Sequence, residues 1–375
     1  MVIKIVFIAN TGWYLNNFRR STLEEFVFRG HDVSVLCPRH SGEDLLSDVT
    51  VAIQTFELDN VGTSIFSELR SLFEIYFRLK QLEPDFVFSF NPKTNLYSLL
   101  SCEILGVPCV PNVSGVGNAS QLVGLKAIIY KFLSRFSYKT AKKIFFQNEE
   151  DQHAFYELGV LESLSYEILP GSGVDLSRFQ PTLPRPSRPF RFLLACRLIR
   201  QKGVLEYLQA AELVDRTTGR SVEFWLAGVP DNSARAVSNA EIDEYVDKGI
   251  IRFLGQVQDI ASIMPEIDCV VLPSYYPEGV PRVLLEGAAS GKVLITTDRP
   301  GCRNVVTEGA NGFFVTPGSV DSLLSIFDRV LSLTDSDLQE MGKSSRELAE
   351  CRFDERLVID AYLNSVSTIT GITHC

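Results

Sequence analysis

One stretch of the chain, residues 269–286, decides the fold, and it reads CVVLPSYYPEGVPRVLLE. Its first four residues form a continuous apolar run, which is typical of a strand in a sheet that is covered on both faces. Pro273 ends this strand, and Pro281 marks the start of a helix, because proline is favoured in a first helical turn. A strand, a loop and a helix in this order are the repeating unit of a doubly wound α/β sheet.

The same order of elements recurs on both sides of a proline-rich segment, in which five of the 17 prolines lie between Pro170 and Pro189. Proline interrupts helices and central strands, so this segment is predicted to be a linker. Before it, we expect a helix over about 17–29, ended by Gly30, and strands at 3–9, 32–36, 86–90, 107–113 and 144–147. After it, we expect a helix ending near 214 and strands at 191–195, 223–227, 252–254, 269–273, 293–296 and 312–315.

The predicted fold is therefore α/β, with two Rossmann-like, doubly wound domains that face a cleft. The expected boundaries are 1–170 for the first domain, 171–189 for the linker and 190–353 for the second domain. Residues 354–375 are expected to form a helix that crosses back to the first domain. A length of 375 residues fits two domains of ordinary size.

The composition excludes several classes of protein. With 36 basic and 46 acidic residues, the net charge is −10, which argues against a general nucleic-acid binder. The 45% hydrophobic and 22% charged shares exclude a largely disordered chain. No apolar run approaches the roughly 20 residues of a spanning helix, and the N-terminal run is predicted to be a strand rather than a signal peptide. The eight cysteines form no C-x-x-C pair, as expected of buried thiols in a reducing cytosol.

Two carboxylates surround the predicted start of the helix at Pro281. The loop before this helix leaves backbone amides free to bind an anion, with Glu278 just outside the helix and Glu286 about one and a half turns inside. Carboxylates accept hydrogen bonds from neighbouring hydroxyl groups, so the arrangement suits a sugar nucleotide. The alternative is a capping carboxylate followed by a solvated glutamate.

Two cations follow the first strand of the second domain, where open parallel sheets bind ligands. Arg197 and Lys202 lie five residues apart, and together they have the reach and charge to bind both phosphates of a diphosphate. The alternative is a pair of surface cations without a ligand.

These segments together resemble the retaining glycosyltransferases of family 4, which have the GT-B arrangement of two Rossmann-like domains. The family has two glutamates with seven residues between them, matched by Glu278 and Glu286, and an arginine and a lysine matched by Arg197 and Lys202. The resemblance implies that Glu286 binds the ribose of the donor and Glu278 the donor sugar. It also implies that Arg197 and Lys202 neutralise the diphosphate, while the amides of Gly279 and Val280 support the sugar and phosphates.

Motifs in the first domain resemble the same family. Gly12, after the first strand, resembles a glycine loop that lets the backbone approach the donor, although Trp13 stands where many members have a second glycine. Residues 89–95 (SFNPKTN), which include Lys93, and residues 112–117 (NVSGVG) resemble a subgroup that extends sugars on polyprenyl diphosphate. Lys93 is therefore expected near the acceptor. None of the four histidines lies in a motif loop.

The resemblance implies neither a cofactor nor a metal. The string Asp335-Ser336-Asp337 spells the D-x-D of metal-dependent glycosyltransferases of another fold, but it lies between two helical segments and is predicted to cap a helix. A dehydrogenase is not favoured, because no G-x-G-x-x-G follows either opening strand.

A basic amphipathic helix is predicted between Lys126 and Lys143, where six basic residues and no acid occur. At 100° per residue, Lys131, Arg135, Lys139 and Lys142 share an arc of roughly 80°. The neighbouring face carries the apolar residues Ile129, Phe132, Leu133 and Phe136. We expect Lys131, Arg135 and Lys139 to contact anionic headgroups and to bring a lipid-linked acceptor to the enzyme. The alternative is a core helix with a solvated positive face.

The predicted function is a retaining, metal-independent transfer of a hexose or N-acetylhexosamine from a nucleotide sugar, expected to be UDP-linked. The expected acceptor is a glycan growing on a polyprenyl diphosphate, in surface polysaccharide or glycoprotein glycan assembly. The expected location is the cytoplasm, at the inner face of the cytoplasmic membrane. The alternatives are a sugar-nucleotide epimerase or a phosphorylase of similar layout, and a non-catalytic nucleotide-sugar-binding protein.

Overall fold

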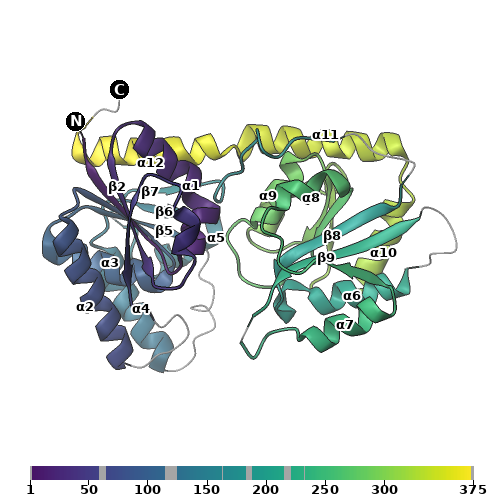
Figure 1. Ribbon diagram of the computed structural model, residues 1–375, viewed down its shortest axis with the longest axis horizontal. Helices are drawn as coiled ribbons and strands as arrows, with labels where there is room; N and C mark the ends of the chain where they lie inside the picture. The colour runs from purple at the N-terminus through teal and green to yellow at the C-terminus, as the bar shows by residue number, and fades with distance from the viewer. Residues whose placement is uncertain are drawn as a thin grey trace. The chain divides into compact units, whose positions relative to one another are not determined.

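The computed structural model describes residues 2–58, 65–114, 125–162, 164–182, 188–214, 221–231 and 233–372. The chain divides into two compact units (Figure 1). The first unit contains residues 1–172 and 356–375, and the second contains residues 173–355.

The first unit is built on a seven-stranded parallel sheet in the order β3-β2-β1-β4-β5-β6-β7. Every residue of the central strands β4 and β5 is buried, as the apolar runs predict. The strands are β1 (Lys4–Ile8), β2 (Asp32–Pro38), β3 (Ala52–Phe56), β4 (Phe86–Phe90), β5 (Cys109–Val113), β6 (Ile144–Phe146) and β7 (Tyr166–Ile168).

Helices cover both faces of this sheet, and each face has its own apolar core. One face is covered by α1 (Gly12–Phe28), the 3₁₀ turn η1 (Glu43–Leu46) and α12 (Glu355–Thr370). The other face is covered by α2 (Ile65–Leu82), α3 (Pro92–Leu105), α4 (Leu125–Tyr138) and α5 (Glu149–Glu157).

The second unit repeats this plan with a six-stranded parallel sheet in the order β10-β9-β8-β11-β12-β13. Its strands are β8 (Phe190–Arg197), β9 (Val222–Val229), β10 (Ile251–Phe253), β11 (Cys269–Leu272), β12 (Val293–Thr297) and β13 (Gly312–Val315). Its helices are α6 (Val204–Leu213), α7 (Asn239–Asp247), α8 (Ile260–Ile263), α9 (Arg282–Ala289), α10 (Val320–Leu331) and α11 (Asp335–Arg352). Short 3₁₀ turns are η3 (Arg200–Lys202), η4 (Met264–Glu266) and η5 (Cys302–Val305).

Each sheet has one point at which the strand order reverses. In the second unit, β8 and β11 are neighbours, yet the chain continues from β8 toward β9 and from β11 toward β12, on opposite sides. The loops after these two strands therefore diverge and leave a crevice at the carboxyl edge of the sheet, where doubly wound proteins bind ligands. The first unit has the same reversal between β1 and β4.

The predicted α/β class with two Rossmann-like units is confirmed and every predicted strand is present, but two further strands were missed and the start of the first helix was wrong. Strands β3 and β7 were missed, because both are edge strands with half-exposed residues and lack a continuous apolar run. The first helix begins at Gly12 instead of near Asn17, since the hydroxyl of Thr11 accepts a hydrogen bond from the amide of Tyr14 (3.0 Å) and caps the helix there.

The segment 173–182, which falls in the expected linker, packs within the second unit. Val174 and Phe179 are buried in its core. The backbone of Val174 accepts a hydrogen bond from Glu355 (3.1 Å) and donates one to Phe353 (2.8 Å). The chain therefore passes between the two units at residues 172–173 and again at 355–356.

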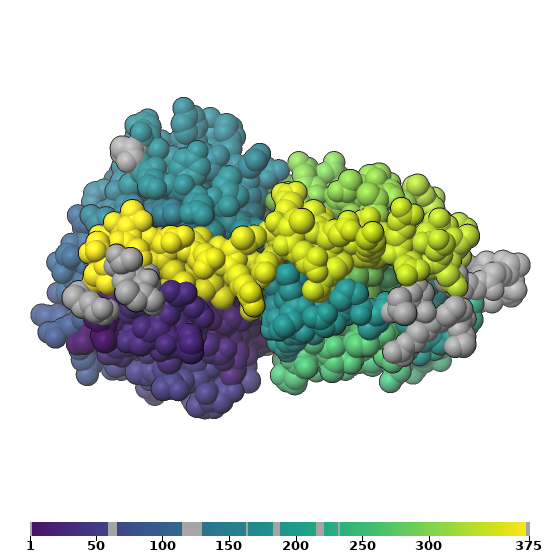
Figure 2. All heavy atoms as spheres, turned by 90° about the horizontal axis from the view of Figure 1, so that it is seen from above, coloured from purple at the N-terminus to yellow at the C-terminus, as the bar shows by residue number. Residues whose placement is uncertain are grey.

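The C-terminal helix α12 completes the core of the first unit, and Figure 2 shows it in yellow across that unit. Tyr362 is fully buried and lies with its ring centroid 4.8 Å from that of Phe88 and 5.0 Å from that of Phe145. Its hydroxyl accepts a hydrogen bond from the side-chain amide of Asn112 (2.7 Å). The last helix thus provides an aromatic anchor to the sheet that is formed from the first half of the chain.

We expect Tyr362→Ala to lower the free energy of unfolding by about 3–5 kcal/mol, because it leaves a large buried cavity. Leu357→Ala is the matched control on the same helix, since Leu357 is 47% exposed and fills no cavity. Equilibrium denaturation in urea measures both variants. Equal stability of the two variants would contradict the anchoring role of Tyr362.

Candidate functional site

The candidate site lies in the second unit at the carboxyl ends of β8 and β11. Strand β8 ends at Arg197, and its loop continues into η3, which contains Lys202. Strand β11 ends at Leu272, and its loop carries Glu278 into α9, which begins at Arg282 as the sequence predicts. The predicted residues from these two segments are therefore brought to one edge of one sheet, at the reversal point.

Backbone contacts join the two loops. The carbonyl of Gln201 accepts hydrogen bonds from the amides of Tyr275 (2.9 Å) and Tyr276 (3.1 Å). Gly203 has φ +76°, and a Cβ built on it would lie 2.6 Å from the carbonyl oxygen of Pro273. Only glycine combines this backbone angle with so close an approach, so the glycine after Lys202 is what lets the two loops meet.

Lys202 and Glu278 form an ion pair in this crevice. Their side chains are only 10% and 13% exposed. The hydroxyl of Ser274 donates a second hydrogen bond to the carboxylate of Glu278 (2.6 Å). The ammonium group is thus held in place by a carboxylate 76 residues away in the sequence, a pairing that the sequence analysis did not predict.

Arg197 is more open, with 51% of its side chain exposed. Its guanidinium lies 3.6 Å from the carboxylate of Asp231, which follows β9. The ring of Tyr276 lies 5.5 Å from the Arg197 guanidinium and 5.8 Å from the Lys202 ammonium. An aromatic face attracts cations, so Tyr276 helps to keep both positive groups at the crevice.

Sequence reasoning missed Asp231, Ser274 and Tyr276 as members of this cluster. Ser274 and Tyr276 lie within the stretch 269–286, but only their contacts in the structure reveal a role. Asp231 lies two residues beyond the carboxyl end of β9, the strand next to β8, and that position was the available signal.

The backbone before α9 presents hydrogen-bond donors. Across the described residues, no group accepts a hydrogen bond from the amides of Gly279 or Val280. Gly301 packs against this loop, since a Cβ built on it would lie 1.7 Å from the carbonyl oxygen of Gly279. Free amides before a helix form a site for negatively charged oxygen atoms.

Glu286 lies within α9 and is nearly buried. Its carboxylate accepts a hydrogen bond from the guanidinium of Arg282 (2.9 Å), one turn earlier. Burial raises the pKa of Glu286, and the positive charge of Arg282 opposes this rise only in part. The loops after β8 and β11 therefore provide two cations, the carboxylate of Glu278 and free backbone amides, and α9 adds the carboxylate of Glu286, which is paired with Arg282. These groups suit a phosphorylated ligand with hydroxyl groups.

Gly12 and Lys93 belong to the first unit. Gly12 is the first residue of α1 and not part of a loop, and its amide donates a hydrogen bond to the hydroxyl of Ser41 (2.9 Å). A Cβ at Gly12 would lie 2.5 Å from the backbone nitrogen of Glu43, so the close packing of η1 on α1 requires glycine. Lys93 pairs with Glu68 on α2 (2.6 Å). The assignment of Gly12 to the donor and of Lys93 to the acceptor stays a prediction.

The predicted basic helix is present as α4, but its extent was wrong. The helix ends at Tyr138, and the amide of Ala141 then bonds the carbonyl of Tyr138 in a turn. Lys139 and Lys142 are exposed but lie beyond the helix, so they do not share its basic arc. The side chains of Lys126 and Ile129, and residues 115–117 of the NVSGVG motif, lie outside the described residues.

Among the described side chains of α4, residues 130–138, apolar residues face outward along with the basic ones. Phe132 is 70% exposed and Phe136 is 61% exposed, and Lys131 and Arg135 are exposed too. The residues that face the core are instead Ser134, Ser137 and Tyr138. The positive face of α4 is solvated, as the alternative of a core helix also expects, and contact of this helix with a membrane stays a prediction.

The D-x-D string opens α11. Thr334 is the N-cap, and its hydroxyl accepts a hydrogen bond from the amide of Asp337, whose carboxylate bonds back to the amide of Thr334 (2.9 Å). The string thus takes part in helix capping, with the cap one residue earlier than expected. Within the described parts of the chain, no three His, Cys, Asp or Glu side chains group as a metal site would require.

Comparison with known families matches both units. The family described as "Glycosyl transferases group 1" matches residues 177–348, and the family described as "Glycosyl transferase 4-like" matches residues 4–148. The first of these ranges contains Arg197, Lys202, Glu278 and Glu286.

Two curated relatives resemble nearly the whole chain. The N,N'-diacetylbacillosaminyl-diphospho-undecaprenol alpha-1,3-N-acetylgalactosaminyltransferase of Campylobacter jejuni is 25% identical, over 96% of this chain and 97% of the relative. The UDP-Gal:alpha-D-GlcNAc-diphosphoundecaprenol alpha-1,3-galactosyltransferase of Escherichia coli is 27% identical, over 88% of each chain.

Solved structures share the fold. A glycosyltransferase from Rickettsia africae matches with a TM-score of 0.78 and 17% identity, over 99% of this chain and all of that chain. The Anabaena protein Alr3699/HepE, solved in complex with UDP, matches with a TM-score of 0.78 and 18% identity, over 98% of this chain and all of that chain.

We expect Gly301→Ala to destabilise the second unit more than Gly309→Ala. Both glycines have a positive φ (79° and 75°), so each variant pays about 1–2 kcal/mol for a left-handed alanine. Only Gly301 adds a clash, because a Cβ at Gly309 has no atom within 4 Å. Urea denaturation measures the free energy of unfolding of both variants. Equal losses of stability would show that the loop around Gly279 moves aside to accommodate the added Cβ.

We expect Glu286→Gln to stabilise the free protein above neutral pH and to lose this advantage near pH 4. A carboxyl group whose pKa is raised on folding stabilises the fold while protonated and costs stability once the pH exceeds the folded pKa. Glutamine carries no charge and avoids this cost. Melting temperatures of both proteins across this pH range test the effect, and a less stable Gln variant at neutral pH would contradict it.

Proposed function

Because the chain belongs to the group 1 glycosyltransferases, with a family 4-like first unit, we propose that it transfers a hexose or N-acetylhexosamine from a UDP-linked sugar to a saccharide on a polyprenyl diphosphate. The observation that carries the proposal is the cluster of Arg197, Lys202 and Glu278 at the reversal point of the second sheet. The names of the two relatives above support both the transfer and the lipid-linked acceptor.

We assign the diphosphate of the donor to Arg197, Lys202 and the amides of Gly279 and Val280. Arg197 is open to solvent, and the free amides lie next to Glu278 in the sequence. When phosphates enter, the ammonium of Lys202 gains a second anionic partner beside Glu278. The carboxylate of Glu278 then has oxygen lone pairs for hydroxyl groups of the sugar.

Glu286 is assigned to the ribose hydroxyls. Its carboxylate is held by Arg282 and is already desolvated, so it needs little further ordering to accept two hydrogen bonds. The free protein bears the cost of this burial, and the bound ligand recovers part of it by supplying hydrogen-bond donors.

The proposed reaction exchanges one bond at the anomeric carbon. The bond from this carbon to the β-phosphate oxygen breaks, and a bond to the acceptor hydroxyl oxygen forms on the same face, so the configuration is retained. The acceptor proton passes to the departing β-phosphate oxygen. Arg197, Lys202 and the amides stabilise the negative charge that grows on that phosphate, which is the interaction that lowers the barrier.

We place the acceptor at the first unit and at the inner face of the cytoplasmic membrane. Lys131 and Arg135 on α4 and Lys139 just after it are exposed and face solvent together with aromatic residues. None of the helices within the described ranges is long and apolar enough to span a bilayer. No observation favours the epimerase, phosphorylase or non-catalytic alternatives over transfer.

We expect Lys202→Ala to lower the transfer rate by about 10²–10³, the usual cost of removing one contact to developing charge. Glu286→Ala should instead weaken UDP binding. Arg200→Ala is the matched control, since Arg200 lies on the same 3₁₀ turn but pairs with Glu241 (2.7 Å). The assay uses UDP-hexoses and UDP-N-acetylhexosamines with a synthetic polyprenyl-diphosphate saccharide. A wild-type rate for Lys202→Ala would remove Lys202 from the site.

A further inference from the structure

Helix α2 carries an apolar stripe on its outer surface. Phe66 is 86% exposed, Phe73 is 56% exposed and Phe77 is 60% exposed, with Leu69 between them also exposed. At 100° per residue, these four positions span an arc of about 80° on the side away from the buried residues Ile75 and Leu79. An exposed row of phenylalanines costs solubility, and such patches mark sites of interaction.

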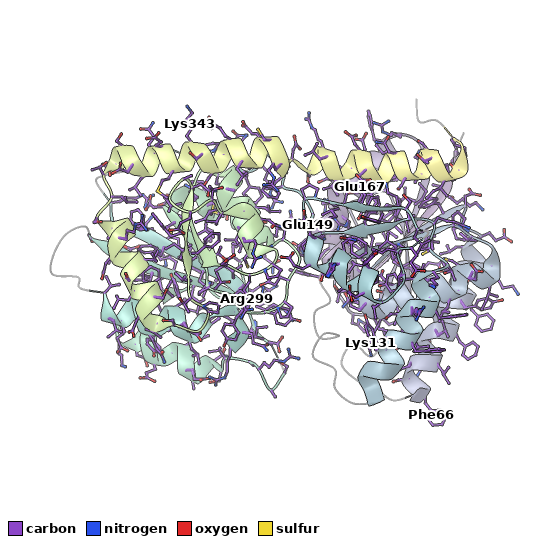
Figure 3. All side chains as sticks on the ribbon, turned by 180° about the vertical axis from the view of Figure 1, so that it is seen from behind. Phe66, Lys131, Glu149, Glu167, Arg299 and Lys343 are labelled. Carbon is purple, nitrogen blue, oxygen red and sulfur yellow. The ribbon has the colours of Figure 1, made fainter. Side chains whose placement is uncertain are left out.

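The same side of the first unit includes α4. Helices α2, α3 and α4 cover one face of the sheet, and α3 packs against both of the others (Figure 1). Figure 3 shows Phe66 projecting from the end of α2 and labels Lys131 on α4. The exposed Phe132 and Phe136 of α4 therefore add to an outward-facing surface that is both aromatic and basic.

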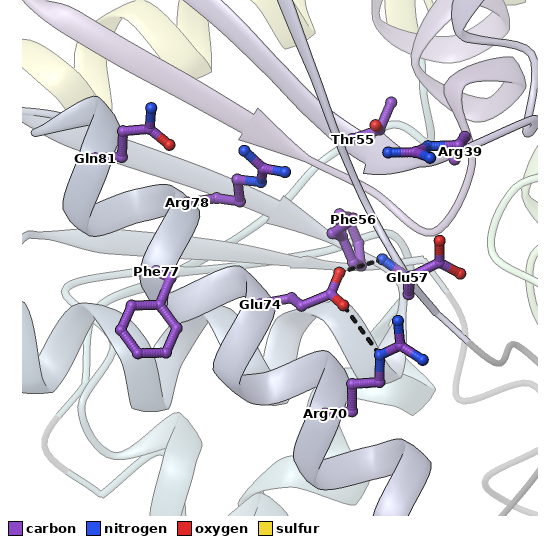
Figure 4. Close-up of a pocket in the computed structure, with 9 residues that line it drawn as sticks. All are labelled: Arg39, Thr55, Phe56, Glu57, Arg70, Glu74, Phe77, Arg78 and Gln81. Carbon is purple, nitrogen blue, oxygen red and sulfur yellow. Dashed lines mark hydrogen bonds and ion pairs between the residues drawn. The ribbon is translucent and has the colours of Figure 1, made fainter.

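An open pocket of about 450 Å³ adjoins the stripe on α2 (Figure 4). Phe77 belongs to both the stripe and the pocket. The pocket lies between α2 and the carboxyl ends of β2 and β3. The charged residues that line it are Arg39, Glu57, Arg70, Glu74 and Arg78.

Among the described residues, two of the three arginines in this pocket have no side-chain partner. Arg70 pairs with Glu74 (3.1 Å), and Glu74 also accepts a hydrogen bond from the amide of Glu57 (2.6 Å). In the part of the chain that the structure describes, the guanidinium groups of Arg39 and Arg78 form neither an ion pair nor a hydrogen bond. The Glu57 carboxylate also lines the pocket, but its side chain extends away from Glu74 (Figure 4).

We propose that this pocket binds the phosphate group of an anionic membrane lipid, with Arg39 and Arg78 as its ligands, while the apolar stripe of α2 enters the bilayer. The inference deepens the proposed function by naming the lipid that holds the first unit at the membrane. The role of this lipid contact rests on the proposed function, but the vesicle experiment that tests the contact does not.

The arrangement of charge and apolar surface favours a lipid over a soluble anion. Guanidinium groups bind phosphate oxygens in a forked geometry, and two that have no ion pair or hydrogen bond among the described residues line the pocket together with Phe77 of the stripe. A helix that lies in a membrane interface carries its aromatic residues in the apolar layer and its cations at the depth of the headgroups. On α2, Arg70 lies about 20° beyond the edge of the stripe and Arg78 about 100° beyond the same edge, on the side of the pocket. The exposed Lys80 lies within the arc of the stripe.

Sedimentation with vesicles tests the proposal. We compare vesicles of phosphatidylcholine alone with vesicles that also contain phosphatidylglycerol, without any acceptor. The double variant Arg39→Gln/Arg78→Gln should bind the anionic vesicles about 25-fold more weakly than wild type, because each cation near an anionic surface contributes a factor of roughly five. Phe73→Ala/Phe77→Ala should weaken binding as well.

The matched control is Lys4→Gln/Arg29→Gln, which removes the same charge from the amino edge of the same unit and should bind like wild type. Melting temperatures confirm folding, and UDP binding in the same samples reports on the second unit separately. Wild-type vesicle binding by Arg39→Gln/Arg78→Gln would overturn the proposal. So would wild-type binding to vesicles that appears only after a polyprenyl phosphate is added to them.

Discussion

The pairing of β8 with β11 is the constraint on which the candidate site depends. The two strands lie side by side in parallel, but their connections run to opposite sides of the sheet. No helix can cover both loops where they diverge, so backbone amides and side chains at this edge remain available for a ligand. The first unit repeats this geometry between β1 and β4, where Asn91 adopts a positive φ of 74° and its side chain accepts a hydrogen bond from the amide of Asn10 (3.2 Å).

The crevice is assembled by close backbone contacts and balanced by charge. Gly203 and Gly301 let neighbouring loops approach closer than any side chain would allow. Lys202 and Glu278 then neutralise each other in a nearly buried position. Glu286 is the exception, since its burial raises its pKa and costs stability at neutral pH. A group that costs stability in the free protein points to a function in the bound one.

The first unit buries apolar residues on both faces of its sheet, yet it also exposes other apolar residues on its outer surface. The face covered by α1 and α12 is closed by the buried ring of Tyr362. On the opposite face, α2 and α4 bury only part of their apolar residues and expose several phenylalanines. The covering of a sheet therefore explains only the inward side of these helices, and the exposed phenylalanines on their outward side fit the membrane contact that we propose.

The sequence by itself determined the fold class and the strands of the second unit, and it predicted candidate site residues that the structure places at the carboxyl ends of β8 and β11. Continuous apolar runs mark central strands wherever they occur, and Glu278 and Glu286 stand in a local pattern around a proline-started helix. The edge strands β3 and β7 were not predicted, because their half-exposed residues form no continuous apolar run. The end of α4 at Tyr138 was also not predicted, since it depends on a turn before β6 and not on helical periodicity.

Only the tertiary structure decided which of these residues meet. The ion pair of Lys202 and Glu278, the contact of Gly301 with Gly279 and the pocket that Arg39 and Arg78 both line all join segments that are distant in the sequence. Such contacts follow from strand order and register, which are set by hydrogen bonds and packing across the whole sheet. A local pattern records the tendency of a segment to form a strand or a helix, but it carries no information about which other segment will lie beside it.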